Sequence, residues 1–211
     1  MERRNRARTG RALDAENPAL DQPVVNIIGE KVALGPFRRD LVAFYLRWIN
    51  DFEVTKTYLV RLRPWTLEER EAWYENVSKG GNDVVDFTIY EKSAARPIGY
   101  ATLESIDYLS RTATLGLLIG EKDCWGKGYG TEVSGLMLDY GFTLLGLHNI
   151  NLTVYAYNKR GIHAYTRAGF RETGRRREAV RFGGRAYDLI YMDCLASEFQ
   201  SPVLRRLIPG D

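Results

Sequence analysis

Hydrophobic and polar residues alternate along several stretches of this chain, as they do in half-buried β-strands. Other stretches are short continuous apolar runs, which are typical of strands buried on both faces. Glycine, proline and polar clusters separate these stretches, as expected of turns. The predicted strands are 24–28, 31–34, 84–90, 98–106, 112–119, 150–156, 170–173 and 187–195.

Apolar residues at helical spacing predict helices between these strands. One stripe lies within 41–49, and Thr66 with Glu69 forms a capping box at the start of a second helix. A long helix follows Gly130, and Asn158 is a good N-cap for a short one that Gly169 closes. Antiparallel strand runs with inserted helices predict a mixed sheet in a single domain.

The stretch from Leu115 to Leu145 combines a buried strand, a glycine-rich turn and a helix. The turn reads Trp125-Gly-Lys-Gly-Tyr-Gly130, with glycines at alternate positions. Glycines allow a ligand to approach the backbone, and a helix N-terminus offers free N–H groups and a positive dipole end. This combination is typical of a diphosphate-binding loop, although a flexible surface turn would have the same composition.

Two common phosphate loops fit the turn poorly. A P-loop needs Ser or Thr after its lysine, but Lys127 is followed by Gly128. A dinucleotide fingerprint needs glycine where Thr131 stands. The spacing Trp125-x-x-Gly128-x-Gly130 instead resembles the coenzyme A pyrophosphate loop of the GNAT superfamily of N-acetyltransferases, with Trp125 where that family usually has Gln or Arg.

A second motif lies beyond the next strand. Asn158 is followed seven residues later by Tyr165 and then by Gly169-Phe170. This pattern resembles the final motif of the same superfamily, and the helical repeat places Asn158 and Tyr165 roughly on one face. A capped helix with a core tyrosine would explain either residue alone. The two motifs in this order favour the resemblance.

The resemblance implies an α/β (α+β) fold with a mixed, mostly antiparallel central sheet of about six to seven strands flanked by helices on both faces. Within the superfamily the chain looks like the RimJ/RimL-like branch, which acetylates protein N-termini, polyamines, amino sugars or antibiotics. It also implies acetyl-CoA as the acetyl donor and a direct attack by a primary amine, without an acyl-enzyme. The residues it assigns to the cofactor are Leu117, Leu118, Ile119, Trp125, Gly126, Lys127, Gly128, Tyr129, Gly130, Thr131, Asn158 and Tyr165.

The resemblance also suggests candidates for proton transfer. Tyr165 is the candidate acid for the leaving thiolate, and a phenol that only packs against the cofactor is the alternative. Many relatives have a glutamate where this chain has Thr114, and a threonine cannot act as a base near neutral pH. Glu104 is the candidate base, and an exposed carboxylate at a strand end is the alternative. Cys124 has no base nearby in sequence and is expected to be an idle thiol.

Composition limits the other possibilities. The net charge of the chain is +3, and its positive charge is concentrated in residues 1–13, which contain five arginines and one acidic residue, Glu2. We expect a basic, disordered extension over 1–25, one acetyltransferase domain over 26–197 and a tail over 198–211. Two cysteines and two histidines predict neither disulfides nor a metal site, and no apolar run is long enough for a membrane span. These features predict a cytoplasmic protein.

Two questions about partners stay open at this point. A homodimer is one, and contact of the basic tail with RNA or the ribosome is the other. The alternative function is a non-catalytic module of the same fold that senses coenzyme A or binds RNA. Retention of the loop glycines, Asn158 and Tyr165 argues against that alternative.

Overall fold

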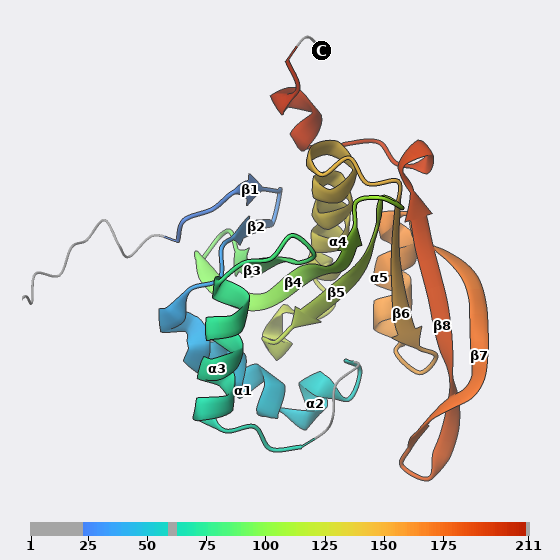
Figure 1. Ribbon diagram of the computed structural model, residues 1–211. Coiled ribbons are helices and arrows are strands. Elements are labelled where there is room, and N and C mark those ends of the chain that lie inside the picture. Colours follow the sequence, from blue (N-terminus) through green and yellow to red (C-terminus); the bar gives the residue numbers. More distant parts are fainter. Residues whose placement is uncertain (1–22, 59–62, 210–211) are drawn as a thin grey trace, which may run out of the picture.

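The computed structural model describes residues 23–58 and 63–209 (Figure 1). An eight-stranded sheet runs through the molecule in the order β1-β2-β3-β4-β5-β6-β8-β7. Neighbouring strands are antiparallel except for β5 and β6, which are parallel. The strands are β1 (Ile27–Ile28), β2 (Val32–Gly35), β3 (Val85–Glu91), β4 (Arg96–Asp107), β5 (Thr112–Ile119), β6 (Asn149–Tyr155), β7 (Arg171–Phe182) and β8 (Arg185–Leu195).

Helices cover both faces of the sheet, as predicted (Figure 1). One core lies between the sheet and α4, and includes Met137, Ile150 and Phe170. The other is rich in aromatic rings and packs α1 and α3 onto the opposite face around Tyr45 and Tyr100. The helices are α1 (Val42–Asn50), α2 (Phe52–Thr55), α3 (Leu67–Ser78), α4 (Tyr129–Asp139) and α5 (Lys159–Ala168).

Local sequence signals explain where several of these helices begin. Thr66 and Glu69 form the predicted capping box of α3, with both reciprocal hydrogen bonds present. The Asn158 side chain accepts a hydrogen bond from the Gly161 amide and caps α5. None of the described helices is long and apolar enough to cross a membrane.

Three features differ from the sequence-based expectations. The sheet has eight strands where about six to seven were expected, since the first segment forms two paired strands, β1 and β2, and the arginine-rich span expected to link the last two strands is itself paired within the long β7–β8 hairpin. The short helix α2 was not predicted. The long helix ends in a π-helical turn, Tyr140–Leu144.

The ends of the chain are described only in part. Of the expected extension over residues 1–25, residues 1–22 lie outside the described residues, and Val25 packs against the aromatic core. At the other end Leu204 is 3% exposed and belongs to the main core. The fully buried Asp139 accepts hydrogen bonds from the amides of Val203 and Leu204, each at 2.9 Å, and from Thr143.

This contact predicts that Asp139 attaches the C-terminal segment to the domain. Asp139→Ala leaves one buried amide, one half-buried amide and a hydroxyl without their acceptor, so we expect a loss of about 2–4 kcal/mol in the free energy of unfolding. Urea denaturation measures the loss. In a chain that ends at Phe199 the same substitution should cost far less, and an equal cost in both backgrounds would show that Asp139 acts within α4 instead.

Candidate active site

The main cleft of the described structure opens where β5 and β6 separate. The two strands pair in parallel only from Thr112 with Asn149 to Thr114 with Asn151. Beyond these three pairs the strands diverge (Figure 1), and a cleft of about 1010 Å³ lies between them. All the residues predicted to hold the cofactor line it, as do Glu104 and Tyr165; their individual roles remain predictions.

Hydrogen bonds made by side chains lie at the point where the strands separate. The Thr114 hydroxyl lies 3.1 Å from Asn151 Oδ1, and Asn151 Nδ2 donates to the Ala113 carbonyl at 3.0 Å. Thr114 therefore has a structural partner at the last rung of the parallel pair. Its position explains how a residue that is no base still contributes to the geometry of the cleft.

The glycine-rich loop ends in an uncapped helix N-terminus. Gly126 and Gly128 have φ angles of 76° and 87°, in the left-handed region that glycine adopts at little cost. Gly128 is the N-cap of α4, and no side chain caps the helix. The first-turn amides are therefore available to an anion, which the helix dipole also favours. Lys31 and Lys127 line the cleft beside this loop.

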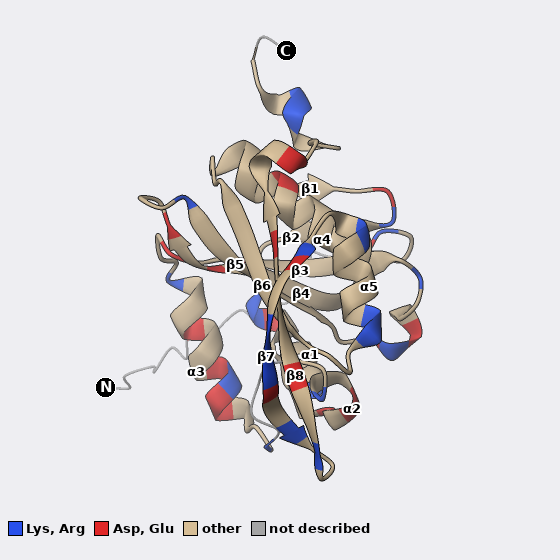
Figure 2. Cartoon of the chain, turned by 90° about the vertical axis from the view of Figure 1, so that its right-hand side faces the viewer, with Lys and Arg blue, Asp and Glu red and all other residues tan. Residues whose placement is uncertain are grey.

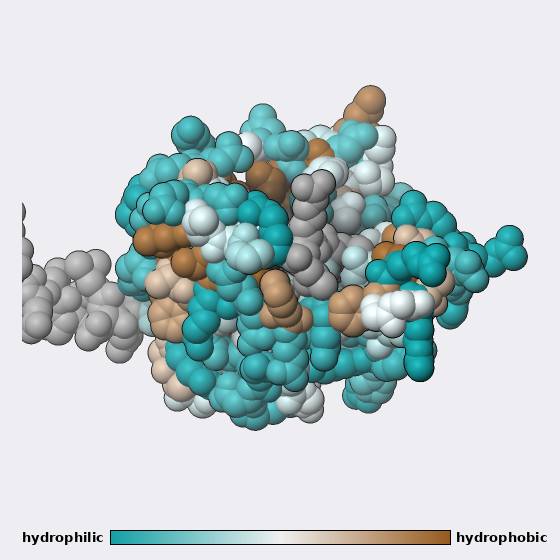
Figure 3. Space-filling model, turned by 90° about the horizontal axis from the view of Figure 1, so that it is seen from below, coloured by the Kyte–Doolittle hydropathy of each residue, from teal (hydrophilic) through white to brown (hydrophobic). Residues whose placement is uncertain are grey.

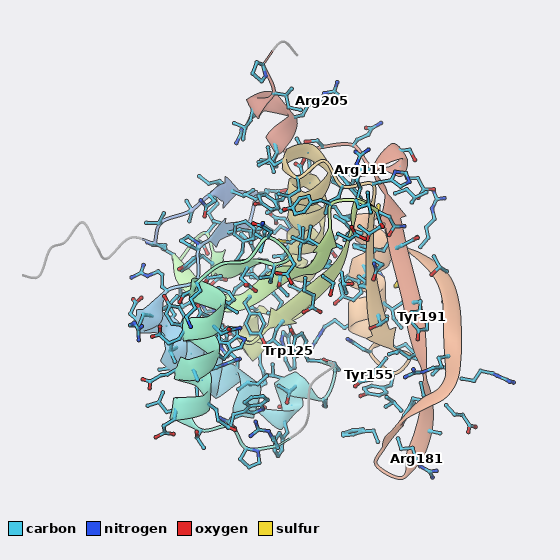
Figure 4. All side chains as sticks on the ribbon, viewed as in Figure 1. Arg111, Trp125, Tyr155, Arg181, Tyr191 and Arg205 are labelled. Carbon is cyan, nitrogen blue, oxygen red and sulfur yellow. The ribbon has the colours of Figure 1, made fainter. Side chains whose placement is uncertain are left out.

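Two large side chains hold the loop in shape. The Trp125 indole, labelled in Figure 4, donates to the Ile119 carbonyl at 2.9 Å. The Tyr129 hydroxyl donates to Glu91 at 2.7 Å, and this bond is the main cause that raises the Tyr129 pKa to about 12. Arg96 pairs with Glu91 at 2.7 Å and, with Tyr129, lowers the pKa of that carboxyl. Because the side chains of Trp125 and Tyr129 bond within the protein, the backbone and the glycines of the loop are left to contact a ligand.

Sequence reasoning missed several residues of this cleft, among them Lys31, Arg160 and Tyr58. The Arg160 guanidinium lies 3.7 Å from the centre of the Trp125 ring, and partial burial lowers its pKa. Tyr58 follows α2 and lies close enough to Glu104 and Tyr165 for their charges to affect it. Arg160 stands two residues after Asn158, so its helix was predicted although its role was not. Nothing in the local sequence around Tyr58 indicates this placement.

The other end of the cleft gathers titratable side chains from three elements. Glu104 is exposed on β4 and pairs across the strands with Thr114, whereas Tyr165 comes from α5. Burial raises the pKa of Tyr165 to about 12, so its hydroxyl stays protonated at neutral pH. Burial also raises the pKa of Tyr58 well above its ordinary value. This end can therefore offer hydroxyl donors and one carboxylate acceptor to a ligand.

Cysteine and histidine contribute little to the chemistry of this cleft. Cys124 is 1% exposed, its thiol accepts a hydrogen bond from Arg96 at 3.2 Å, and burial raises its pKa. A thiol with a raised pKa is a poor nucleophile, which agrees with the expectation of an idle cysteine. His163 is exposed at the rim. Within residues 23–58 and 63–209 no group of three or more potential ligands could hold a metal ion.

Several known proteins resemble this chain in sequence or in structure. The chain is 33% identical over 111 residues to the spermidine N(1)-acetyltransferase of Vibrio cholerae, which covers 53% of this chain and 64% of that enzyme. It is 30% identical over 160 residues to the human alpha/beta-tubulin-N-acetyltransferase 9, covering 69% and 75% of the two chains. The Vibrio enzyme solved with CoA and spermine superposes with a TM-score of 0.73 at 26% identity, covering 81% of this chain and 98% of that one.

A family-level match covers the residues of the site. The sequence model described as the acetyltransferase (GNAT) domain matches residues 31–171, which include the loop, Asn158 and Tyr165. Two predictions, an acetyl-CoA-dependent acetyltransferase and a GNAT-like fold, are confirmed by this match and by the solved structure. The chain belongs to the GNAT acetyltransferase family.

Proposed function

We propose that this protein transfers the acetyl group of acetyl-CoA directly to a primary amine. The observation that carries the proposal is the meeting of a free strand edge, an uncapped helix N-terminus and a protonated phenol in one cleft. Acetyl-CoA would supply an activated thioester there. The protein would supply binding, orientation and proton transfer, and positioning two reactants together accounts for much of such a rate.

The donor half of the proposed site is made mainly of backbone. Beyond Thr114, β4 is the only described strand that pairs with β5, so the stretch Leu117–Ile119 has an edge toward the cleft that an extended chain can join. The amides from Gly126 to Thr131 would hold the pyrophosphate, with Lys31, Lys127 and Arg160 adding positive charge. Asn158 would contact the cofactor from the opposite wall.

The acceptor half would centre on Glu104 and Tyr165. An attacking amine must lose a proton, and Glu104 can accept it directly or through water. Tyr165 would donate a hydrogen bond to the leaving sulfur. Since its pKa of about 12 lies above that of an ordinary thiol, we expect the phenol to keep its proton and to stabilise the thiolate by this hydrogen bond, while the thiolate takes a proton from water after it leaves.

The acceptor amine could belong to any of several chemical classes. The names of the two relatives point to a polyamine and to a protein, and amino sugars and antibiotics complete the classes expected for a RimJ/RimL-like enzyme. A screen of acetyl-CoA turnover with one amine from each class would test the function, with release of the free thiol as readout. Tight binding of coenzyme A without turnover on any amine would support the non-catalytic alternative.

The glycine loop gives a direct test of the donor half. Gly128→Asp places a carboxylate where an anion should bind, and it strains a residue with a φ of 87°. We expect acetyl-CoA affinity, measured by calorimetry, to fall by roughly 100-fold or more. Gly146→Asp is a matched control, because Gly146 also has a positive φ, of 65°, but ends the helix far from the loop. Equal affinities in the two variants would remove the loop from the site.

Tyr165→Phe tests the proposed donor to the leaving sulfur. The change keeps the ring and removes the hydroxyl, so kcat should fall on the order of 100-fold while acetyl-CoA affinity is nearly unchanged. Steady-state kinetics at saturating amine, with calorimetry for the cofactor, separates the two quantities. Weaker cofactor binding with an unchanged kcat would instead make the phenol a binding contact. Tyr108→Phe, at an exposed turn, serves as the control.

A further inference from the structure

The β7–β8 hairpin carries positive charge that the rest of the described chain does not neutralise. Arg171 and Arg175 are paired with Glu198 and Glu172, at 2.6 and 2.5 Å. Four more exposed arginines of the hairpin have no carboxylate partner among the described residues. They are Arg176, Arg177, Arg181 and Arg185. Figure 2 shows the resulting blue segments along β7 and at the hairpin tip.

Strand register divides these arginines between two faces of the sheet. Arg176 lies opposite Leu189, which lies opposite Tyr155 on β6. Arg185 precedes Tyr187 by two residues and therefore shares that face. The same face carries Glu104, through its pairing with Thr114 and the pairing of Thr114 with Asn151. Arg181 pairs with Ala186 and points to the opposite face.

The helices leave this part of the face uncovered. Among the described elements, α1, α2 and α3 pack on the same face around Tyr100 and Leu118, on the β3–β5 side of the sheet. Tyr191 on β8 is 37% exposed. Seen from below, the hairpin forms the right-hand side of the molecule and is mostly hydrophilic around a few hydrophobic side chains (Figure 3). Arg176 and Arg185 thus lie on an open surface that continues from Glu104.

Aromatic contacts fix the hairpin tip beside the acceptor end of the cleft. The Tyr157 ring stacks on Tyr155 and on Phe182, with centroids 5.1 and 5.8 Å apart, and meets the edge of Tyr187 at 4.8 Å. The Tyr157 hydroxyl donates to the Lys56 carbonyl at 2.5 Å. Tyr157 directly precedes Asn158, and Lys56 is two residues before Tyr58. Figure 4 shows Tyr155 at the end of β6 and Arg181 toward the tip.

The charges along this path change sign with distance from the reacting centre. Glu104 lines the cleft, and Asp86, whose pKa is raised mainly by burial, lies close enough for the charge of Glu104 to raise it as well. The end of the cleft at Glu104 therefore suits one ammonium group. Four strand spacings, about 19 Å, separate Glu104 on β4 from Arg176 on β7, and Arg185 lies on the intervening strand β8. That is about twice the Debye length of about 10 Å at 0.1 M salt, so these arginines act on the part of a bound acceptor that passes close to them and little on its reacting amine. A long polycation would place its remaining ammonium groups near these arginines.

We infer that the acceptor is a polypeptide whose reacting amine is followed by acidic residues, and that Arg176 and Arg185 bind those acidic side chains. This inference rests on the proposed acetyltransferase function and names its substrate class. An extended peptide advances about 3.3 Å per residue, so residues three to eight of the acceptor would pass the hairpin. Carboxylates there would form charge-assisted hydrogen bonds with the two guanidinium groups.

Three decapeptides with one shared N-terminal dipeptide test the inference. Residues three to eight are acidic in one, uncharged in the second and lysine-rich in the third, and spermidine is the fourth acceptor. We expect kcat/KM to be about tenfold or more higher for the acidic peptide than for the uncharged one at low salt, and lowest for the two polycations. The preference should shrink as salt is raised. Equal or better use of spermidine would overturn the inference.

A pair of charge-matched variants locates the effect. Arg176→Gln with Arg185→Gln should reduce the acidic preference to about twofold or less, without changing kcat/KM for the uncharged peptide. Arg175→Gln with Arg181→Gln removes the same charge from the other face and should keep the preference. An equal loss in both variants would show only a general effect of net charge and would contradict the inference.

Direct binding separates this inference from the proposed function. Fluorescence anisotropy of a labelled acidic decapeptide reports the hairpin contact without turnover, and the first variant should weaken binding by about tenfold. If no amine is acetylated but this contact is found, the acetyltransferase proposal fails and the contact stands. If a single-stranded RNA of ten nucleotides binds through Arg176 and Arg185 and the acidic peptide does not, the surface serves nucleic acid and the inference is wrong.

Discussion

The parting of β5 from β6 after three residue pairs is the constraint on which the site depends. A parallel pair continued to the strand ends would satisfy the backbone of Leu117–Ile119 and leave no room between the strands. Because pairing stops at Thr114 and Asn151, the remaining polar groups of β5 need another partner on that side, which water or an extended ligand can supply. The cleft is thus a consequence of sheet geometry before any catalytic side chain is considered.

The loop after β5 uses side chains for support and leaves the backbone to face the cleft. Trp125 bonds to the last carbonyl of β5, and Tyr129 bonds to Glu91 on β3. This division of labour accounts for the tryptophan at a position where the wider family has Gln or Arg. If backbone amides hold the diphosphate, the side chain of Trp125 is not needed for that contact. It can then support the loop, and Arg160 can lie on its ring.

The parts of the fold that could be predicted are those whose signal is local. The capping box of α3, the Asn158 cap and the alternation along β6 each occupy a few consecutive residues, and the structure has them where the sequence indicates. Only the first residues of β7 were predicted as a strand; its arginine-rich remainder has no such signal, because long charged side chains neither alternate with apolar ones nor favour strands. Its pairing with β8 decides its conformation. Tyr58 reaches Glu104 and Tyr165 only through tertiary packing, which no short window of sequence contains.

The lining of the cleft extends from Gly29 to Val203, and Asp139 holds the latter in place. A cavity assembled from such distant segments exists only in the fully folded chain, since each wall depends on contacts that close large loops. Any ligand of this cleft therefore binds the native state alone. By thermodynamic linkage its free concentration sets part of the stability of the entire domain, so the protein inside a cell rich in its donor would resist unfolding more than the purified apoprotein does.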